Sequence, residues 1–352
     1  MRRALELAAR AVRTFPNPKV GAVVVRYGEV IGEGFHRGAG HPHAETEALN
    51  GIAASGATMY VTLEPCSHHG KTPPCAPAVA DAGVSRVVVA LEDPDERVRG
   101  RGLALLRERG VKVEMGLLET EARELNAPFL LHRTEKRSFL SLKLAVSIDG
   151  RIAAPDGSSR WITGPQARRR VHELRRAADA VLVGAGTVLA DDPALTVRDV
   201  HTTRQPLRVV VDARGRVDPS ARLFSEPGGV VVATTDASAH DRRTEWKEAG
   251  AEVLVLPSTA AGVDLGALLR ELGRLEVVEV FCEGGPTLAT SLLGAGLVDR
   301  LELHQGPVAL GSSGLPVFGD LGVATIGDAA RWTLLESFVL GDDVVSRYER
   351  RG

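Results

Sequence analysis

Cysteine, aromatic residues and net charge are all scarce in this chain. Its 352 residues include three cysteines, aromatic side chains make up 4% of the composition, and the formal net charge is −2. An odd, small number of cysteines argues against a disulfide framework, and the low charge gives no electrostatic basis for binding nucleic acid or an anionic membrane. The sequence also lacks an apolar run of about eighteen residues and a signal-peptide core. We therefore expect a cytoplasmic protein.

The rest of the composition is typical of a globular protein. Apolar residues make up 44% of the chain and charged residues 25%. The length exceeds that of one hydrophobic core, so we expect two domains of roughly 100 to 200 residues each. We place the boundary in the charged stretch HRTEKRS, which predicts one domain over residues 1–137 and a second over residues 138–352.

Short β-branched runs alternate with helical patterns along both domains. This alternation predicts two α/β domains, each with a sheet covered by helices on both faces. The first is expected to have strands at 20–26, 58–63, 86–91 and 111–115, and helices at 43–55 and 76–83. The second is expected to have strands at 139–146, 180–186, 207–212, 229–234, 251–256 and 277–285, and a helix at 165–179. Cys282, in the last of these strands, is expected to pack in the core.

One histidine and two cysteines have the spacing of a metal site. His43 begins a helical pattern in HPHAETEAL, and Cys66 and Cys75 bracket the loop PCSHHGKTPPC. Together they provide three ligands for zinc and leave a fourth position open, as in catalytic sites. Glu45 would lie beside the metal and suits a general acid/base acting on water. The helix expected to start at Cys75 would favour a thiolate there.

The other histidines of these segments leave one alternative open. His68 and His69 lie in the middle of the loop, too close to Cys66 to close a tetrahedron easily. A structural site that includes one of them would nevertheless satisfy zinc, although it would leave Glu45 without a role. His41 is expected to be a solvated loop residue.

The H-x-E and P-C elements resemble the signature of the zinc deaminases, in which the second cysteine follows the first as P-C-x-x-C. Here eight residues separate Cys66 from Cys75. This longer loop resembles that of the bifunctional riboflavin-biosynthesis deaminase/reductases. The resemblance covers nearly the whole chain through the segments PNPKVGAVVV, HAE, TLEPCSHHGKTPPC, LKLAVSIDGRIA, RWITG, VGAGTVLADDPALTVR and CEGGPTL.

For the first domain, the resemblance implies a cytidine-deaminase-like fold of three layers. It implies zinc on His43, Cys66 and Cys75, with Glu45 moving the proton. The implied substrate is a diaminopyrimidinone that carries a phosphoribosylamino group and loses ammonia to become the aminouracil. Lys71, in the loop, is our candidate for binding the phosphate, and an exposed lysine without that role is the alternative.

Two glycine turns of the second domain suit phosphate binding to different degrees. GAGTVL, at residues 184–189, follows a strand but has leucine where a third glycine would stand, so it is a weak dinucleotide fingerprint. In CEGGPTL, Gly284 and Gly285 follow a strand and Pro286 suits the first position of a helix. The amides of that helix start could bind a phosphate, and a bare tight turn is the alternative.

The resemblance assigns the second domain to the riboflavin reductases. It implies a dihydrofolate-reductase-like fold, NADPH as cofactor, and reduction of the ribosyl chain to ribityl. The implied cofactor contacts are Ala145, Trp161, Thr187, Asp191, Gly285, Pro286, Thr287, Leu288, Ala289, Thr290 and Ser291. The implied substrate contacts are Ser159, Arg175, Leu195, Arg198 and Glu283, and the two arginines suit a phosphate. Lys143 is a further candidate, for the sugar chain, with a surface role as the alternative.

The preference for NADPH over NADH is partly readable from the residues themselves. Asp212 ends the strand LRVVVD, where an acid could bind an adenine-ribose hydroxyl. Arg214 and Arg216 follow it and could pair with a 2′-phosphate. We therefore predict NADPH.

Two other functions stay open at this point. The chain could be a deaminase whose C-terminal domain is non-catalytic or altered. It could also be a zinc-stapled module that binds nucleic acid, which the charge and the low aromatic content disfavour. We expect a small-molecule substrate, no nucleic-acid or membrane partner, and a homo-oligomer. Val308 stands where the family commonly has a lysine, a departure that concerns only the C-terminal details.

Overall fold

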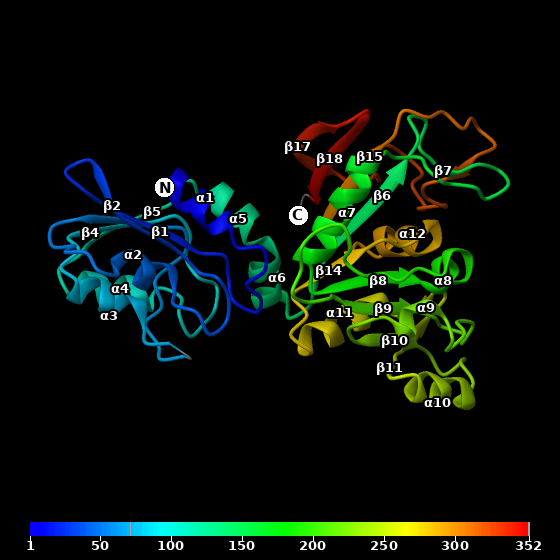
Figure 1. Cartoon of the computed structure of the whole chain (residues 1–352), viewed down its shortest axis with the longest axis horizontal. Helices are drawn as coiled ribbons and strands as arrows, with labels where there is room; N and C mark the ends of the chain where they lie inside the picture. Colours follow the sequence, from blue (N-terminus) through cyan, green and yellow to red (C-terminus); the bar gives the residue numbers. More distant parts are fainter. Residues whose placement is uncertain (71, 351–352) are drawn as a thin grey trace. The chain divides into compact units, whose positions relative to one another are not determined.

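The computed structural model describes residues 1–70 and 72–350. They form two compact units that divide between Lys136 and Arg137, coloured from blue to teal and from green to red in Figure 1. This division lies inside the charged stretch at residues 132–138. Within the described residues, no helix has the length and apolar character needed to cross a membrane.

The first unit is built on a five-stranded sheet in the order β2-β1-β3-β4-β5. Strand β1 is antiparallel to β2 and β3, whereas β3, β4 and β5 are parallel. The strands are β1 (Gly21–Arg26), β2 (Glu29–Phe35), β3 (Thr58–Val61), β4 (Arg86–Val89) and β5 (Lys112–Met115). The helices are α1 (Arg2–Ala9), α2 (Ala44–Leu49), α3 (Cys75–Asp81), α4 (Arg101–Glu108), α5 (Glu119–Leu125) and α6 (Ala127–Glu135). Helices α2, α3 and α4 cover one face and α1 and α5 the other, which gives three layers (Figure 1).

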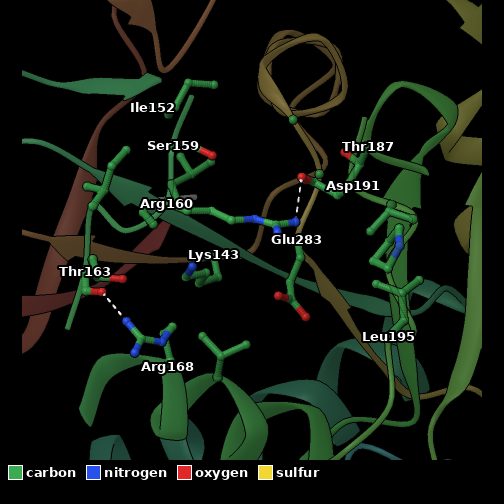
Figure 2. Close-up of a pocket in the computed structure, with 18 of the residues that line it drawn as sticks. Lys143, Ile152, Ser159, Arg160, Thr163, Arg168, Thr187, Asp191, Leu195 and Glu283 are labelled. Atoms are coloured by element: carbon green, nitrogen blue, oxygen red, sulfur yellow. Dashed lines mark hydrogen bonds and ion pairs between the residues drawn. The ribbon is translucent and has the colours of Figure 1, made fainter. Parts of the chain in front are cut away.

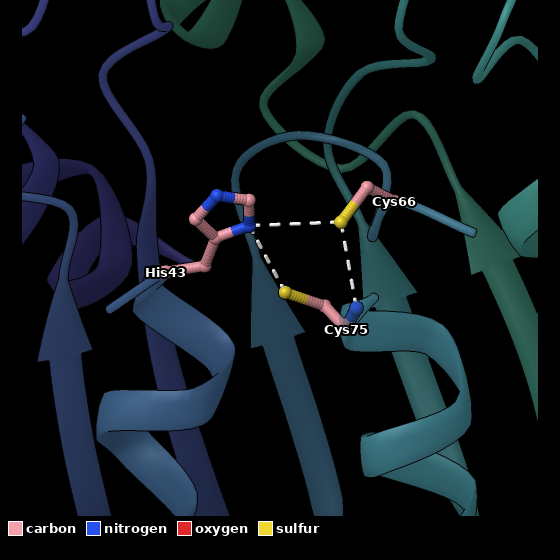
Figure 3. Close-up of side chains that lie close together, drawn as sticks. All are labelled: His43, Cys66 and Cys75. Carbon is pink, nitrogen blue, oxygen red and sulfur yellow. Dashed lines mark hydrogen bonds between the residues drawn. The ribbon is translucent and has the colours of Figure 1, made fainter. Parts of the chain in front are cut away.

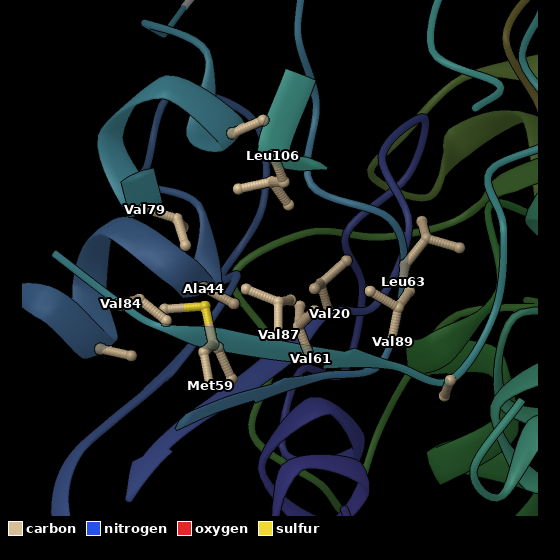
Figure 4. Close-up of a cluster of buried hydrophobic side chains, with 14 of the residues drawn as sticks. Val20, Ala44, Met59, Val61, Leu63, Val79, Val84, Val87, Val89 and Leu106 are labelled. Atoms are coloured by element: carbon tan, nitrogen blue, oxygen red, sulfur yellow. The ribbon is translucent and has the colours of Figure 1, made fainter. Parts of the chain in front are cut away.

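Helix α2 lies close against the sheet because β2 carries glycines beneath it. A Cβ atom on Gly34 would stand 2.4 Å from the carbonyl oxygen of Ala44, and one on Gly32 would stand 2.1 Å from that of Ala48. The rest of this interface is filled by buried aliphatic side chains, among them Val61 (Figure 4). This packing fixes the start of α2, from which the candidate metal and acid/base residues come.

The second unit is built on a nine-stranded sheet in the order β11-β10-β9-β8-β14-β6-β15-β18-β17. The strands from β11 to β15 in this order are parallel to one another. Strand β18 is antiparallel to β15, and β17 is antiparallel to β18. Its strands are β6 (Phe139–Val146), β8 (Ala180–Gly184), β9 (Leu207–Val211), β10 (Val230–Thr234), β11 (Ala251–Val255), β14 (Glu279–Cys282), β15 (Arg300–Gln305), β17 (Trp332–Leu340) and β18 (Asp343–Arg350). Two small sheets pair β7 (Arg151–Ala153) with β16 (Leu315–Pro316) and β12 (Ser258–Thr259) with β13 (Gly262–Val263).

Helices cover both faces of this large sheet. They are α7 (Pro165–Ala177), α8 (Ala185–Asp191), α9 (Arg222–Ser225), α10 (His240–Glu248), α11 (Leu265–Arg274) and α12 (Pro286–Gly294). One buried cluster joins α11 and α12 to the sheet, and a second joins α7, α8, α9 and α10 to its other face. Cys282 is fully buried in the first cluster, which confirms its predicted core position.

The predicted α/β class of both units is confirmed, and the ends of their buried strands lie within three residues of the predicted ranges. The helix predicted over residues 43–55 is shorter and ends at Leu49. The sequence reading missed the antiparallel strand β2 and the C-terminal strands β15, β17 and β18.

Candidate active sites

The three predicted metal ligands meet at one point of the first unit. His43 immediately precedes α2, Cys66 lies in the loop after β3, and Cys75 is the first residue of α3. The Nδ1 atom of His43 lies 3.2 Å from Sγ of Cys75 and 3.6 Å from Sγ of Cys66 (Figure 3). Zinc bonds of about 2.0 to 2.3 Å place tetrahedral ligands about 3.3 to 3.8 Å apart. The three donor atoms therefore fit zinc.

Two hydrogen bonds prepare these side chains for a metal. Thr72 Oγ1 lies 3.1 Å from Nε2 of His43, so the outer ring nitrogen is engaged and Nδ1 is left for the metal. The backbone N–H of Cys75, at the start of α3, donates to Sγ of Cys66 over 3.4 Å. The helix start thus stabilises negative charge on Cys66, and the thiolate expected at Cys75 stays a prediction. Hydrogen bonds from Cys75 and His43 lower the pKa of the Cys66 thiol.

Glu45 lies beside this cluster in the first turn of α2. Its side chain is buried, and the residue is 4% exposed. Burial, and then the negative charge of Cys66, raise the pKa of Glu45 to about 7. A carboxyl group that gains and loses a proton near neutral pH is suited to general acid/base chemistry.

His36 packs against the ring of His43. The sequence reading did not single out this histidine. His36 is buried, and its Nδ1 donates to the carbonyl oxygen of Pro42 over 3.0 Å. Its Nε2 lies 3.0 Å from the amide nitrogen of Asn17, and its ring packs edge-on against His43 with the centroids 5.2 Å apart. Its partner Asn17 lies in the segment PNPKVGAVVV, one of those that carry the family resemblance, and this was the only sign in the sequence that could have pointed to His36.

The other candidates of this loop do not join the metal cluster. Among the described residues the cluster consists of His43, Cys66 and Cys75 alone, so neither His68 nor His69 closes a fourth position. His41 and His69 are exposed, as expected for His41, while His68 is half-buried. Lys71 lies outside the described residues.

The second unit contains a cavity of about 580 Å³ at the carboxyl ends of β6, β8 and β14. This is where ligands bind in open parallel sheets, and the volume suits a small-molecule site. The predicted residues that line it are Lys143, Ala145, Ser159, Trp161, Arg175, Thr187, Asp191, Leu195, Arg198, Glu283, Gly285 and Pro286 (Figure 2). The five predicted contacts that follow, Thr287 to Ser291, lie in α12 instead, and Leu288 and Ala289 are buried in the core.

Two predicted substrate residues bind each other across this cavity. Arg175, on α7, donates from Nε and Nη2 to the carboxylate of Glu283 over 2.5 and 3.1 Å, and from Nη1 to the carbonyl of Thr196 over 2.8 Å. Although burial opposes ionisation, Arg175 holds the pKa of Glu283 below its usual range. Arg175 is thus occupied by a carboxylate, whereas Arg198 also lines the cavity and has no ion pair within the part of the chain described.

Lys143 projects into the same hollow from the middle of the sheet (Figure 2). Burial lowers the pKa of its ammonium group, and the charge of Glu283 opposes that effect. No hydrogen bond from this ammonium to another described residue is present. Its donors are therefore available to a bound molecule, and the surface alternative for Lys143 is wrong.

The glycine turn after β14 forms a cradle at the edge of the cavity. Gly285 caps α12, and Pro286 occupies its first turn. A Cβ atom on Gly285 would stand 3.5 Å from Oγ1 of Thr187, at the start of α8. Free backbone amides at a helix start suit the phosphates of a dinucleotide, so these residues fit NADPH.

The carboxylate of Asp212, which could have bound a ribose hydroxyl, is occupied by the turn that follows it. Its two carboxylate oxygens accept backbone N–H groups of Arg214, Gly215 and Val217 over 3.3, 3.1 and 2.7 Å, and they are buried. Asp212 therefore organises the turn after β9. The side chains of Arg214 and Arg216 remain exposed.

Sequence reasoning missed three arginines at the cavity, and one of them, Arg168 of α7, donates from Nη1 to the carbonyl oxygen of Thr163 over 2.8 Å. Arg160 reaches across it to Asp191, with Nη2 3.4 Å from Oδ1 (Figure 2), and Arg222 lines it from α9. Arginine in a loop or on a short helix carries no periodic signal, so the place of Arg160 and Arg222 at the cavity comes only from the fold.

Comparison with known proteins gives matches to both units. Residues 138–346 match the model of the RibD C-terminal domain, and residues 1–91 match that of the cytidine and deoxycytidylate deaminase zinc-binding region. The chain is 45% identical to the riboflavin biosynthesis protein RibD of Escherichia coli, over 98% of this chain and 96% of that one. It is 42% identical to RibD of Aquifex aeolicus, over 99% and 97% of the two chains.

Solved structures agree over the same length. A RibD structure from Acinetobacter baumannii is 39% identical, with a TM-score of 0.88 over 100% of this chain and 98% of that one. A diaminohydroxyphosphoribosylaminopyrimidine deaminase/reductase from Thermotoga maritima is 35% identical, with a TM-score of 0.85 over 100% and 97% of the two chains.

Proposed function

The chain belongs to the RibD family of bifunctional riboflavin-biosynthesis enzymes, and from this membership we propose which residues carry each reaction. The enzyme deaminates a phosphoribosylamino-diaminopyrimidinone with zinc and then reduces the ribosyl chain to ribityl with NADPH. Both domain models match, so the alternative of a deaminase alone is not favoured. We assign deamination to residues 1–137 and reduction to residues 138–352.

In the deaminase site, His43, Cys66 and Cys75 would hold the zinc. Zinc, when bound, activates water as a nucleophile near neutral pH. Glu45 would take one proton from the attacking water and give it to the ring nitrogen, and would then carry the proton of the added hydroxyl group to the departing ammonia, because its buried carboxyl group lies next to the cluster. Thr72 holds the His43 ring in the tautomer that presents Nδ1.

In the reductase site, the glycine turn at Gly285 and the start of α8 at Thr187 would hold the dinucleotide, which supplies a hydride. Reduction of the ring-opened sugar adds that hydride to carbon and one proton to the heteroatom of the same double bond. We assign the proton to the ammonium of Lys143, which regains it from solvent. Arg198 binds the substrate phosphate, and Arg175 orients Glu283.

The mutual distances of the three donor atoms carry the deaminase assignment. Its test is the zinc content of purified variants. Cys75→Ser should lose nearly all of its zinc, whereas His68→Ala, a change in the same loop, should keep the wild-type stoichiometry. Equal zinc loss in both variants would overturn the ligand assignment, and zinc retained by Cys75→Ser would do the same.

We further propose a cytoplasmic homo-oligomer. A phosphorylated substrate and a nicotinamide cofactor favour the cell interior. The edge strand β17 exposes Leu334 and Val339, which are 53% and 67% accessible, and an exposed apolar sheet edge favours pairing between copies. Sedimentation of the purified enzyme tests this directly, and a monomer at micromolar concentration would contradict it.

A further inference from the structure

A second buried carboxylate lies beside Lys143, on the strand next to it. In the parallel pairing of β6 with β15, Glu302 stands opposite Lys143 and His304 stands opposite Ala145. Residues opposite one another on adjacent strands point to the same face of a sheet. Glu302 and His304 therefore share the face that carries two residues of the cavity wall. They are 4% and 0% exposed, and neither has a role in the reaction so far described.

The surroundings of Glu302 keep it ionised. Nε2 of His304 lies 3.0 Å from Oε1 of Glu302, and the guanidinium nitrogens of Arg170 and Arg347 lie 3.4 and 3.6 Å from its two oxygens. Burial opposes the charge, but the hydrogen bond of His304 and the two arginines together bring the pKa of Glu302 to about 2. Burial also lowers the pKa of His304, so its ring is neutral and donates from Nε2 to the carboxylate.

This arrangement matters for the charge of Lys143. Burial disfavours its ammonium form, and the nearby carboxylates, Glu283 and Glu302, favour that form. The charge of Glu283 is directly paired with Arg175. Glu302 is paired with Arg170 and Arg347, and it adds a second negative charge near Lys143, smaller in its effect than that of Glu283. The charged and titratable groups that act on Lys143 are Glu283 after β14, Arg175 from α7, and Glu302 and His304 from β15. Arg170 from α7 and Arg347 from β18 contact Glu302.

We propose that Glu302, fixed by His304, is a second buried countercharge that, together with Glu283, keeps the proton on Lys143 for the reduction, and hence a positioning residue of that reaction. The inference rests on the proposed role of Lys143 as proton donor. Lys143 gives one proton to the heteroatom as the hydride reaches carbon, and one proton from water restores the ammonium group. The countercharge makes that second transfer favourable at neutral and mildly alkaline pH.

The test is the pH profile of NADPH oxidation with the deaminated aminouracil as substrate. In Glu302→Gln, loss of the negative charge should move the alkaline limb of kcat to lower pH by at least about one unit, since a nearby charge shifts a pKa by about one to three units. At pH 9 the variant should then be about tenfold slower than the wild type, while the two differ by less than about threefold at pH 6. A merely structural role would lower kcat equally at every pH.

Two matched variants complete the experiment. Glu336→Gln removes another carboxylate that binds Arg347, over 2.9 Å, but it lies on β17 and should leave the limb in place. Arg170→Gln removes a cation from Glu302 and should move the limb to higher pH, so it tests the inference even if Glu302→Gln does not fold. An unmoved limb in Glu302→Gln, or a downward shift in Arg170→Gln, would overturn the inference.

The result also separates this inference from the function on which it rests. Lys143→Gln should lose reductase activity at every pH. If it keeps full activity, the role assigned to Lys143 is wrong. If it loses activity while neither Glu302→Gln nor Arg170→Gln moves the limb, only the countercharge is wrong.

Discussion

Replacement of Glu45 by glutamine should stop deamination without removing the zinc. The amide has nearly the shape of the carboxyl group, and the site is buried, with the residue 4% exposed, so the packing at the start of α2 should not change. None of the three clustered donor atoms is altered. The variant loses only the ability to accept and return a proton.

The size of the effect follows from what Glu45 is placed to do. Positioned general acid/base groups contribute about 10² to 10⁴ in rate. Because Glu45 both accepts the proton from water and delivers it to the substrate, we expect a loss in kcat of about 10³ or more, which corresponds to about 4 kcal/mol of transition-state stabilisation.

Ammonia release by the purified variant measures this loss, with metal analysis on the same sample. Glu47→Gln is the matched control, because Glu47 lies on the same helix but binds Arg37 and the backbone N–H of Phe35. It should deaminate at nearly the wild-type rate. The reasoning would be refuted if Glu45→Gln released ammonia within about threefold of the wild type, or if its activity fell only in proportion to lost zinc.

Three other predictions concern the reductase, the cofactor and stability. Glu283→Gln should lower reductase kcat/KM by about a hundredfold or more and leave ammonia release unchanged; an unchanged reductase rate would remove Glu283 from the site. The enzyme should prefer NADPH to NADH, and equal kcat/KM with both would contradict this. Burial raises the pKa of Asp93 to about 6 from an ordinary value of 3.8. The folded protein therefore binds this proton more tightly than the unfolded chain, and stability is lost as the pH rises from about 4 to 6. Asp93→Asn should accordingly add up to about 3 kcal/mol at pH 8 and almost nothing at pH 4; an equal gain at both pH values in urea unfolding of the full chain would contradict this.

The strands that form the centre of each sheet could be predicted because they are continuous apolar runs, as expected where helices cover both faces. Strand β15 could not, because its two buried residues are Glu302 and His304. Burial of such polar groups depends on partners from α7 and β18, which no local pattern shows. Strand β2 was missed for a related reason. Its glycines allow α2 to pack close against the strand, and they add no apolar side chains to the sequence pattern.

The metal cluster could be predicted from short motifs, because the types of its donor atoms and their spacing are themselves the chemical signal. The pairing of Arg175 with Glu283 could not, since 108 residues separate them and either could equally serve the substrate. Asp212 shows the converse: a position typical of a ribose ligand is used for a turn, because nearby backbone N–H groups reach the carboxylate first.

The central claim is that one chain carries out both reactions in sequence, and a single coupled measurement tests it. Purified protein with zinc, the diaminopyrimidinone substrate and NADPH should release one ammonia and then oxidise one NADPH for each substrate molecule, with NADPH oxidation lagging behind ammonia release. Ammonia release with no NADPH oxidation, or NADPH oxidation that precedes ammonia release, would contradict the account.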